Sequence, residues 1–185
     1  MAREEALIIS EELFEALAPV SGDLDWEYVW PIILAVQDKW IQPILGQSLY
    51  EKIMADIKAD ALAEPYKSLV EDYVARVCVW FTCYQGFPFW GVKVVNSGVI
   101  QRITDDGSVI SFNDIDKLSE LSRGQGEFYA QRLIDYLCAN STDFPEYNTN
   151  KSEEMSPERA NYQAGLNLEP YTKPGINYNY WRGWL

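Results

Sequence analysis

Residues 65–84 are apolar on almost every side when placed on a helix, and this limits what the chain can fold into. Apolar side chains recur there at steps of three and four residues, and around Trp80 they cover nearly the whole circumference. A helix that is apolar all round has to lie at the centre of a fold. We therefore expect this segment to be the spine of the core, with Trp40 and Trp80 buried in it.

Helical periodicity also extends over much of the remaining chain. The segments with this pattern are residues 10–18, about 31–46, about 47–61 and about 111–139. Pro19 ends the first of them and Gly46 ends the second. Gly124 and Gly126 lower the helix propensity in the middle of the last one, so the pattern allows a break there.

Residues 91–112 have a different character, because β-branched residues replace the helical pattern. Turn signals separate these runs, one at residues 96–98 and one at Asp105, Asp106 and Gly107. This pattern predicts two or three short strands that form a small β-hairpin. The fold class that follows is mainly α, a bundle of four or five helices with the hairpin as an insertion.

The periodicity ends at Asn140, and turn-forming residues occur throughout the rest of the chain. We therefore predict a helical domain over residues 1–140 and an extended C-terminal arm over residues 141–185. The arm carries five aromatic residues that can anchor it: Tyr171, Tyr178, Tyr180, Trp181 and Trp184. Each buries roughly 150–250 Å² in a pocket, so together they reach the size of a specific interface. Docking on a neighbouring chain is favoured over folding back on the same domain.

The charge and the residue types exclude several classes of function. The net charge is −13, which repels phosphate and predicts weak binding to free duplex DNA. The chain has no histidine, which is the commonest general base and metal ligand, and it has no phosphate-binding loop. The acidic pairs at residues 11–12 and 71–72 have the surroundings of solvent-exposed faces. We therefore assign no catalytic, cofactor-binding or metal-ligating residue, and we expect no enzyme activity.

The cysteines and the apolar runs indicate the cellular compartment of the chain and whether it crosses a membrane. Cys78, Cys83 and Cys138 have no paired spacing, which favours a reducing environment, and we expect all three to be small buried residues. No long apolar run follows the first residues, and the longest uncharged stretch, residues 77–92, is too short to cross a bilayer. These features predict a soluble chain made in the cytoplasm, without a membrane partner.

One stretch of the chain resembles a known family. An apolar helix is followed by Pro-Ile-Leu-Gly and then by Leu-Tyr, a pattern carried by Ile32, Ala35, Gln37, Ile41, Pro43, Ile44, Leu45, Gly46, Leu49 and Tyr50. This resembles the N-terminal signature of phage head–tail connector proteins, the helical ring subunits below the portal, and most of all those of crAss-like phages of gut bacteria. The long apolar helix, a hairpin with its turn at Asp105, Asp106 and Gly107, and the last helix follow in the same order as in that family, so the resemblance covers roughly residues 5–140.

The resemblance implies a structural role in the neck of a virion. Such proteins form closed rings, usually of twelve copies, between the portal and the tail. The ring continues the DNA channel without recognising sequence, and it contacts the portal and further neck or tail proteins. It implies no cofactor, and it implies assembly in the cytoplasm of the host. An acidic channel that does not grip phosphate, and an arm that reaches a neighbour, agree with this role.

Other functions remain open on the sequence alone. The chain could form another neck module, such as a stopper or a tail-completion ring. It could be an acidic inhibitor that mimics DNA and occupies a basic groove, although its acids are spread along the chain. A small hydrolase that uses only carboxylates is disfavoured because no convincing site is present.

Overall fold

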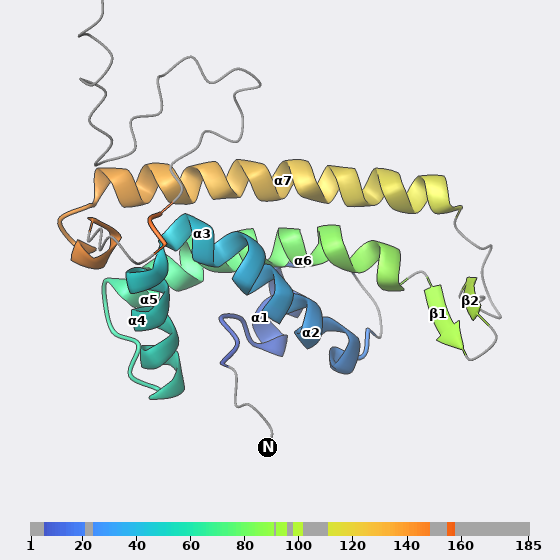
Figure 1. Ribbon diagram of the computed structural model, residues 1–185, viewed down its shortest axis with the longest axis horizontal. Helices are drawn as coiled ribbons and strands as arrows, with labels where there is room; N and C mark the ends of the chain where they lie inside the picture. Colours follow the sequence, from blue (N-terminus) through green and yellow to red (C-terminus); the bar gives the residue numbers. More distant parts are fainter. Residues whose placement is uncertain are drawn as a thin grey trace, which may run out of the picture.

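The computed structural model describes residues 6–20, 24–90, 92–95, 98–101, 111–148 and 155–157 (Figure 1). This part of the chain is mainly helical, which confirms the predicted class. Two long helical rods and one long single helix lie side by side, and the shorter elements pack around them.

The central rod is the apolar segment singled out in the sequence. It consists of α5 (Tyr66–Leu69), the π-helical turn η2 (Val70–Val74) and α6 (Ala75–Trp90). The long helix α7 (Phe112–Ala139) runs back antiparallel along it (Figure 1). Ser111 caps α7, because its hydroxyl accepts the Asp114 N–H at 3.3 Å. The helix is unbroken at Gly124 and Gly126.

The second rod covers another side of α6. Its parts are α2 (Trp26–Val36), the π-helical turn η1 (Gln37–Ile41) and α3 (Gln42–Leu45). In η1 the Gln42 N–H donates to the Gln37 carbonyl five residues back. The wider turn comes just before Pro43, a residue that lacks an N–H and would crowd the carbonyl four residues back in a regular helix. The π turn thus lets the helix continue to Gly46.

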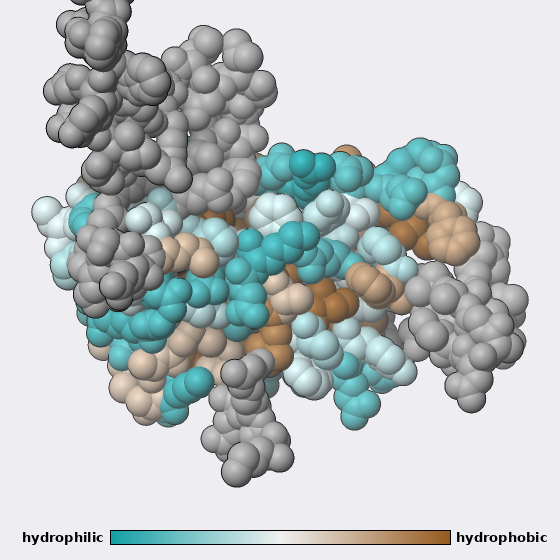
Figure 2. Space-filling view, viewed as in Figure 1, coloured by the Kyte–Doolittle hydropathy of each residue, from teal (hydrophilic) through white to brown (hydrophobic). Residues whose placement is uncertain are grey.

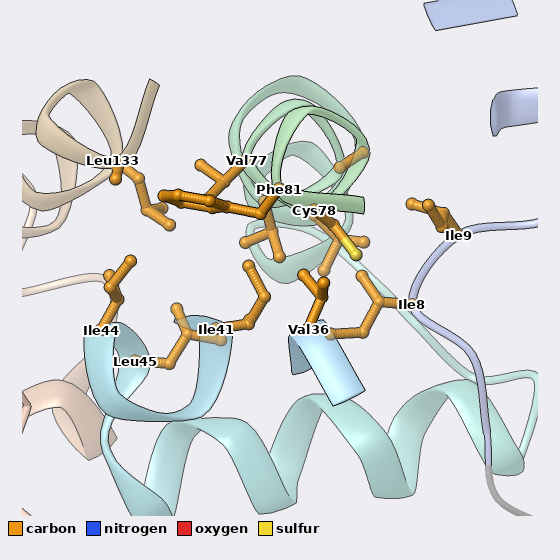
Figure 3. Packing of buried hydrophobic residues seen from close by; sticks show 14 of the residues in the cluster. Ile8, Ile9, Val36, Ile41, Ile44, Leu45, Val77, Cys78, Phe81 and Leu133 are labelled. Atoms are coloured by element: carbon orange, nitrogen blue, oxygen red, sulfur yellow. The ribbon is translucent and has the colours of Figure 1, made fainter. Parts of the chain in front are cut away.

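The buried cluster gathers between these rods and the N-terminal segment. Phe81 of α6 points toward Leu133 of α7, and Cys78 points toward Val36 of the second rod and Ile8 of the N-terminal segment (Figure 3). Trp40 is half-buried and stacks on Phe81, with ring centroids 4.2 Å apart and planes inclined by 3°. The predicted spine is confirmed, since α6 has more side chains with an exposed fraction of 0% than any other described helix.

Trp80 is a correction to the sequence prediction. It is only half-buried, and it is not among the side chains that pack against the buried cluster. It lies one helical turn after the half-buried Arg76, on a flank of α6 that its neighbours leave partly open. The apolar circumference of this segment therefore does not imply burial on every side.

The N-terminal residues are part of the same core. Helix α1 (Glu11–Leu17) begins at the Ser10 cap, as predicted. Before it, Ile9 is fully buried, and the Gln37 side chain holds the preceding backbone in place. Its Oε1 accepts the Ile8 N–H at 2.8 Å, and its Nε2 donates to the Ala6 carbonyl at 3.2 Å. Both polar ends of this buried amide are therefore satisfied.

The predicted boundary at residue 140 is wrong for the residues just after it. Phe144 and Tyr147, the latter in the 3-10 turn η3 (Pro145–Asn148), are fully buried. Phe144 packs edge-on against Tyr66, with centroids 5.5 Å apart. The sequence did not indicate this burial, because the segment is rich in turn-forming residues and has no helical period. The segment nevertheless covers the end of the α6–α7 pair. The domain extends at least to Tyr147.

A pair of strands follows α6. Strand β1 (Val92–Val95) pairs antiparallel with β2 (Gly98–Gln101), and Val92 lies opposite Gln101. The pair occupies only the first part of the range predicted for strands. The predicted turn at Asp105, Asp106 and Gly107 lies outside the described residues.

Candidate functional site

The described residues offer little for chemistry. No group of three or more Cys, Asp, Glu or His side chains in this part of the chain could hold a metal ion. Cys78 and Cys83 are buried, and burial raises the pKa of both thiols to about 12, which keeps them protonated and unreactive. Cys138 is exposed, which corrects the prediction that all three cysteines are buried. None of the described helices is both long and apolar enough to span a membrane.

The residues of the Pro-Ile-Leu-Gly pattern meet at one place in the fold. Gly46 forms the turn between α3 and α4 (Gln47–Lys58) with a φ of 77°, a conformation that glycine adopts without strain. Around this turn Leu45 and Leu49 are fully buried, and Tyr50 packs against the cluster from the edge. Gln37 and Pro43 shape the helix that leads to it. The pattern thus builds the turn, and its members serve the fold.

The same turn receives a distant part of the chain, a contact that sequence reasoning missed. The Gln47 N–H, at the start of α4, donates to the Met155 carbonyl at 3.0 Å. A Cβ on Gly46 would lie 2.8 Å from Pro157 Cδ, so only glycine permits this approach. We call this contact between Gly46–Gln47 and residues 155–157 the clasp. The sequence marked Gly46 as a helix stop, and nothing in it pointed to the partner.

A second contact ties the same region down. The Tyr66 hydroxyl donates to Glu146 Oε2 at 2.7 Å. Burial of the ring raises the pKa of Tyr66 to about 12, and the hydrogen bond and charge of Glu146 add to the shift. Lys52 lies over the same ring, 4.7 Å from its centroid. Residues 140–148 therefore belong to the domain and not to the arm.

Helix α7 exposes an apolar flank, which we call the α7 stripe: Leu118, Leu121 and Phe128. Their exposed fractions are 41%, 69% and 42%. The face of α7 that touches α6 carries small residues at the same level, with Ser122 and Gly126 buried there. The larger apolar side chains thus point away from the core, although the helical spacing of these three residues is also that of a buried stripe. Several exposed apolar side chains on one side of a helix are typical of an interaction surface.

The opposite flank of α7 borders an open cleft of about 700 Å³, the α6–α7 cleft. It is lined by Lys39, Tyr84, Gln85, Pro88, Phe89, Asp116, Ser119 and Glu120. Pro88 has no N–H to give to the Tyr84 carbonyl, and Ser119 of α7 donates to that carbonyl at 2.7 Å instead. Phe89 is exposed over 68% of its surface. In Figure 2 apolar residues reach the surface below the right half of α7.

The predicted arm anchors Tyr171, Tyr178, Tyr180, Trp181 and Trp184 all lie outside the described residues. The structure does place part of the predicted arm, because residues 144, 147 and 155–157 pack on the same domain. For these residues the folding-back alternative is right. Docking on a neighbouring chain therefore stays a prediction for the residues after Pro157.

The model of one protein family matches residues 41–156, a family of unknown function called DUF6712. The match begins just before the Gly46 turn and ends inside the segment that closes the clasp on it. It contains the α7 stripe and every residue of the α6–α7 cleft except Lys39. No curated protein and no solved structure matches the chain.

Proposed function

The chain belongs to DUF6712, a family of unknown function, and we propose that it is a structural subunit that forms a ring in the neck of a phage virion. The ring, of about twelve copies, would join the portal to further neck or tail proteins and continue the DNA channel. The proposal combines the resemblance to head–tail connectors with the surface of α7. Its place of action is the virion, after assembly in the host cytoplasm.

The observation that carries the proposal is the pair of unlike surfaces on the two flanks of α7. Successive residues of a helix turn by about 100°, so the stripe and the cleft residues of α7 have centres about 160° apart. A contact between the stripe of one copy and the α7 flank that borders the cleft of the next joins two different patches and leaves the cleft itself open. Such a heterologous contact repeats head to tail, and it ends in a ring when the rotation closes.

The charge supports the channel. A net charge of −13 disfavours stable contacts with phosphate, so DNA can move past the subunits. Within the described part, α7 carries the exposed ion pairs Arg123–Glu127 and Arg123–Glu120 on the flank away from the stripe, with N–O distances of 2.9 and 3.6 Å. Exposed pairs of this kind contribute little to the stability of the domain.

The test is assembly of the full-length protein, measured by analytical ultracentrifugation and by electron microscopy with and without the portal. Leu121→Gln replaces the most exposed residue of the stripe by a polar residue of similar helix propensity, and Leu121→Met is the matched control. A leucine buried in an interface contributes about 1.5–3 kcal/mol. We therefore expect Leu121→Gln to raise the assembly midpoint concentration by about tenfold or more, and Leu121→Met to change it little.

The result that refutes the proposal is equally specific. A wild-type protein that stays monomeric with the portal present, or two Leu121 variants that assemble equally well, removes the stripe from any ring contact. A monomer that instead binds a basic groove on a host enzyme would favour the DNA-mimic alternative. Circular dichroism of both variants checks that the domain itself is unchanged.

The role of the arm is tested by ending the chain after Pro157, and not after Asn140, where the helical period ends. Ending the chain after Asn140 removes the core residues Phe144 and Tyr147, and each large-to-small loss of this kind costs about 3–5 kcal/mol. Since a domain is stable by only about 5–15 kcal/mol, we expect that truncation to unfold it. Ending the chain after Pro157 keeps the clasp and removes only the arm. We expect this shorter truncation to leave the melting temperature nearly unchanged and to weaken association.

A further inference from the structure

We propose that the α6–α7 cleft is the receptor for the aromatic end of the arm, residues 170–185, of a neighbouring copy of the chain. This inference rests on the proposed ring, and it identifies the surface that the arm occupies. Three features support this assignment: the lining of the cleft, the composition of the segment, and the length of chain that connects the segment to the clasp.

The cleft has the lining that aromatic side chains require. The α6 residues Tyr84, Pro88 and Phe89 provide flat apolar surfaces, and Phe89 is the second most exposed large apolar residue of the described part of the chain. Large aromatic side chains prefer stacked or edge-to-face contact with such rings. Since α6, α7 and η1 all contribute, the walls are parts of packed helices, which hold the cleft in a fixed shape.

The cleft is also polar along its α7 side. Asp116 and Glu120 are exposed carboxylates on this side, and Glu120 also pairs with Arg123 at 3.6 Å. Lys39 contributes a cation from η1, and Gln85 an amide. The cleft therefore offers acceptors for a basic group and donors for backbone carbonyls or tyrosine hydroxyls, next to an apolar wall.

Residues 170–185 match this combination better than any other part of the chain. They hold the five predicted anchors, and their charged side chains are Lys173 and Arg182, with no acid, in a chain whose net charge is −13. A basic, aromatic segment is complementary to a cleft with two carboxylates and exposed rings. Arg182 can also lie over an aromatic face, where a guanidinium is favourable. Tyr and Trp are the residues that dominate interface energetics.

The length of the chain permits the contact between copies. The clasp fixes Pro157 at the Gly46 turn, and residues 158–169 lie between it and the basic segment. Extended residues span at most about 3.3–3.6 Å each, so this connection reaches up to about 40 Å. A helix with its side chains is about 10–12 Å wide, so the arm can cross to the next subunit.

The first experiment locates the segment. The full-length protein carries the photo-cross-linker p-benzoylphenylalanine in place of Trp181, and equal amounts of ¹⁴N- and ¹⁵N-labelled protein are mixed under assembly conditions. Peptides are identified by mass spectrometry after irradiation. We expect cross-links to peptides that contain residues 84–90 or 116–120, with both isotopes in one cross-linked pair. Cross-links to other helices overturn the inference. A complete absence of mixed-isotope pairs also overturns it, because the arm then folds onto its own domain, whereas contacts between copies give mixed pairs in about half of the cross-links.

The second experiment tests the chemistry with matched variants. Phe89→Ser alters the cleft, and Phe128→Ser alters the α7 stripe, each at an exposed phenylalanine. We expect Phe89→Ser to lower the cross-link yield at least fivefold and Phe128→Ser to leave the yield per assembled ring unchanged. Reversing the cleft charges with Glu120→Lys should have the effect of Phe89→Ser, and Arg182→Glu in the same chain should restore the cross-link. Equal yields in Phe89→Ser and wild type, or no rescue of the charge reversal, overturn the inference.

These outcomes separate the inference from the proposed ring. If rings form but their arms cross-link to surfaces other than the cleft, the proposed function is supported and the cleft is not the receptor for the arm. If mixed-isotope cross-links form in the cleft but no ring assembles, the cleft is the receptor for the arm and the proposed role in the neck is wrong.

Discussion

Gly126 and Gly124 lie two residues apart on α7, and the structure predicts opposite effects for the same substitution at these positions. A Cβ on Gly126 would lie 3.0–3.2 Å from three ring atoms of Phe81, whereas a Cβ on Gly124 would meet nothing within 4 Å. The Phe81 ring cannot retreat easily, because Trp40 stacks on it with a centroid distance of 4.2 Å. Gly126, Phe81 and Trp40 thus form one tightly packed layer between α7, α6 and η1.

The magnitudes follow from two terms. Replacing glycine by alanine within a helix stabilises the folded state by about 1 kcal/mol. At Gly126 this gain is opposed by overpacking against a fixed ring, which costs about 1–3 kcal/mol. We therefore expect Gly124→Ala to raise the free energy of unfolding by about 1 kcal/mol, and Gly126→Ala to lower it by up to about 2 kcal/mol.

Urea denaturation followed by circular dichroism measures both values, and thermal melting provides a second readout, since 1 kcal/mol corresponds to about 2–4 °C for a domain of this size. Phe81→Leu frees space in the layer, so Gly126→Ala should cost less in that background than in the wild type. Equal stabilisation by the two glycine substitutions would refute the close approach of α6 and α7 at this level.

Two further predictions concern groups that titrate. In the native protein at pH 8 we expect a thiol reagent to modify Cys138 alone, and to modify Cys78 and Cys83 only after denaturation; fast native modification of more than one thiol would contradict the burial of α6. The pKa of Tyr66 rises from 10.0 to about 12 on folding, so its hydrogen bond to Glu146 stabilises the protein fully below pH 10 and less as the pH rises toward 12. The stability difference between wild type and Tyr66→Phe, from urea midpoints between pH 9 and 11.5, should therefore fall as the pH rises, and a constant difference would exclude this role.

The helices could be predicted from the sequence because each has a long apolar period and clear end signals. Ser10 and Ser111 are N-caps in the structure, and Gly46 ends the second rod. The π turns at η1 and η2 were not foreseen, because a single inserted residue shifts the apolar period by little.

The errors share a physical origin, since periodicity describes the burial of one helix and not which neighbour covers it. Trp80 has an apolar setting in the sequence, yet the flank of α6 that it shares with Arg76 is left partly open. Leu121 has the spacing of a buried residue, yet Ser122 takes the inward position and leaves it exposed. Phe144 has no periodic context at all, yet it is fully buried at the end of the α6–α7 pair. Only the packing of distant segments decides these cases.

The two ends of the region that matches the family lie close to the two sides of the clasp. Residues 41–156 begin at the helix that leads into the Gly46 turn and end where Met155 bonds to the N-terminus of α4. The two ends of this region thus meet, and the α7 stripe lies between them. Residues after Pro157 are outside both the clasp and the matched region. Under the proposed function the two parts would have different roles, with the matched region providing the contact surfaces and the arm adding a connection between copies.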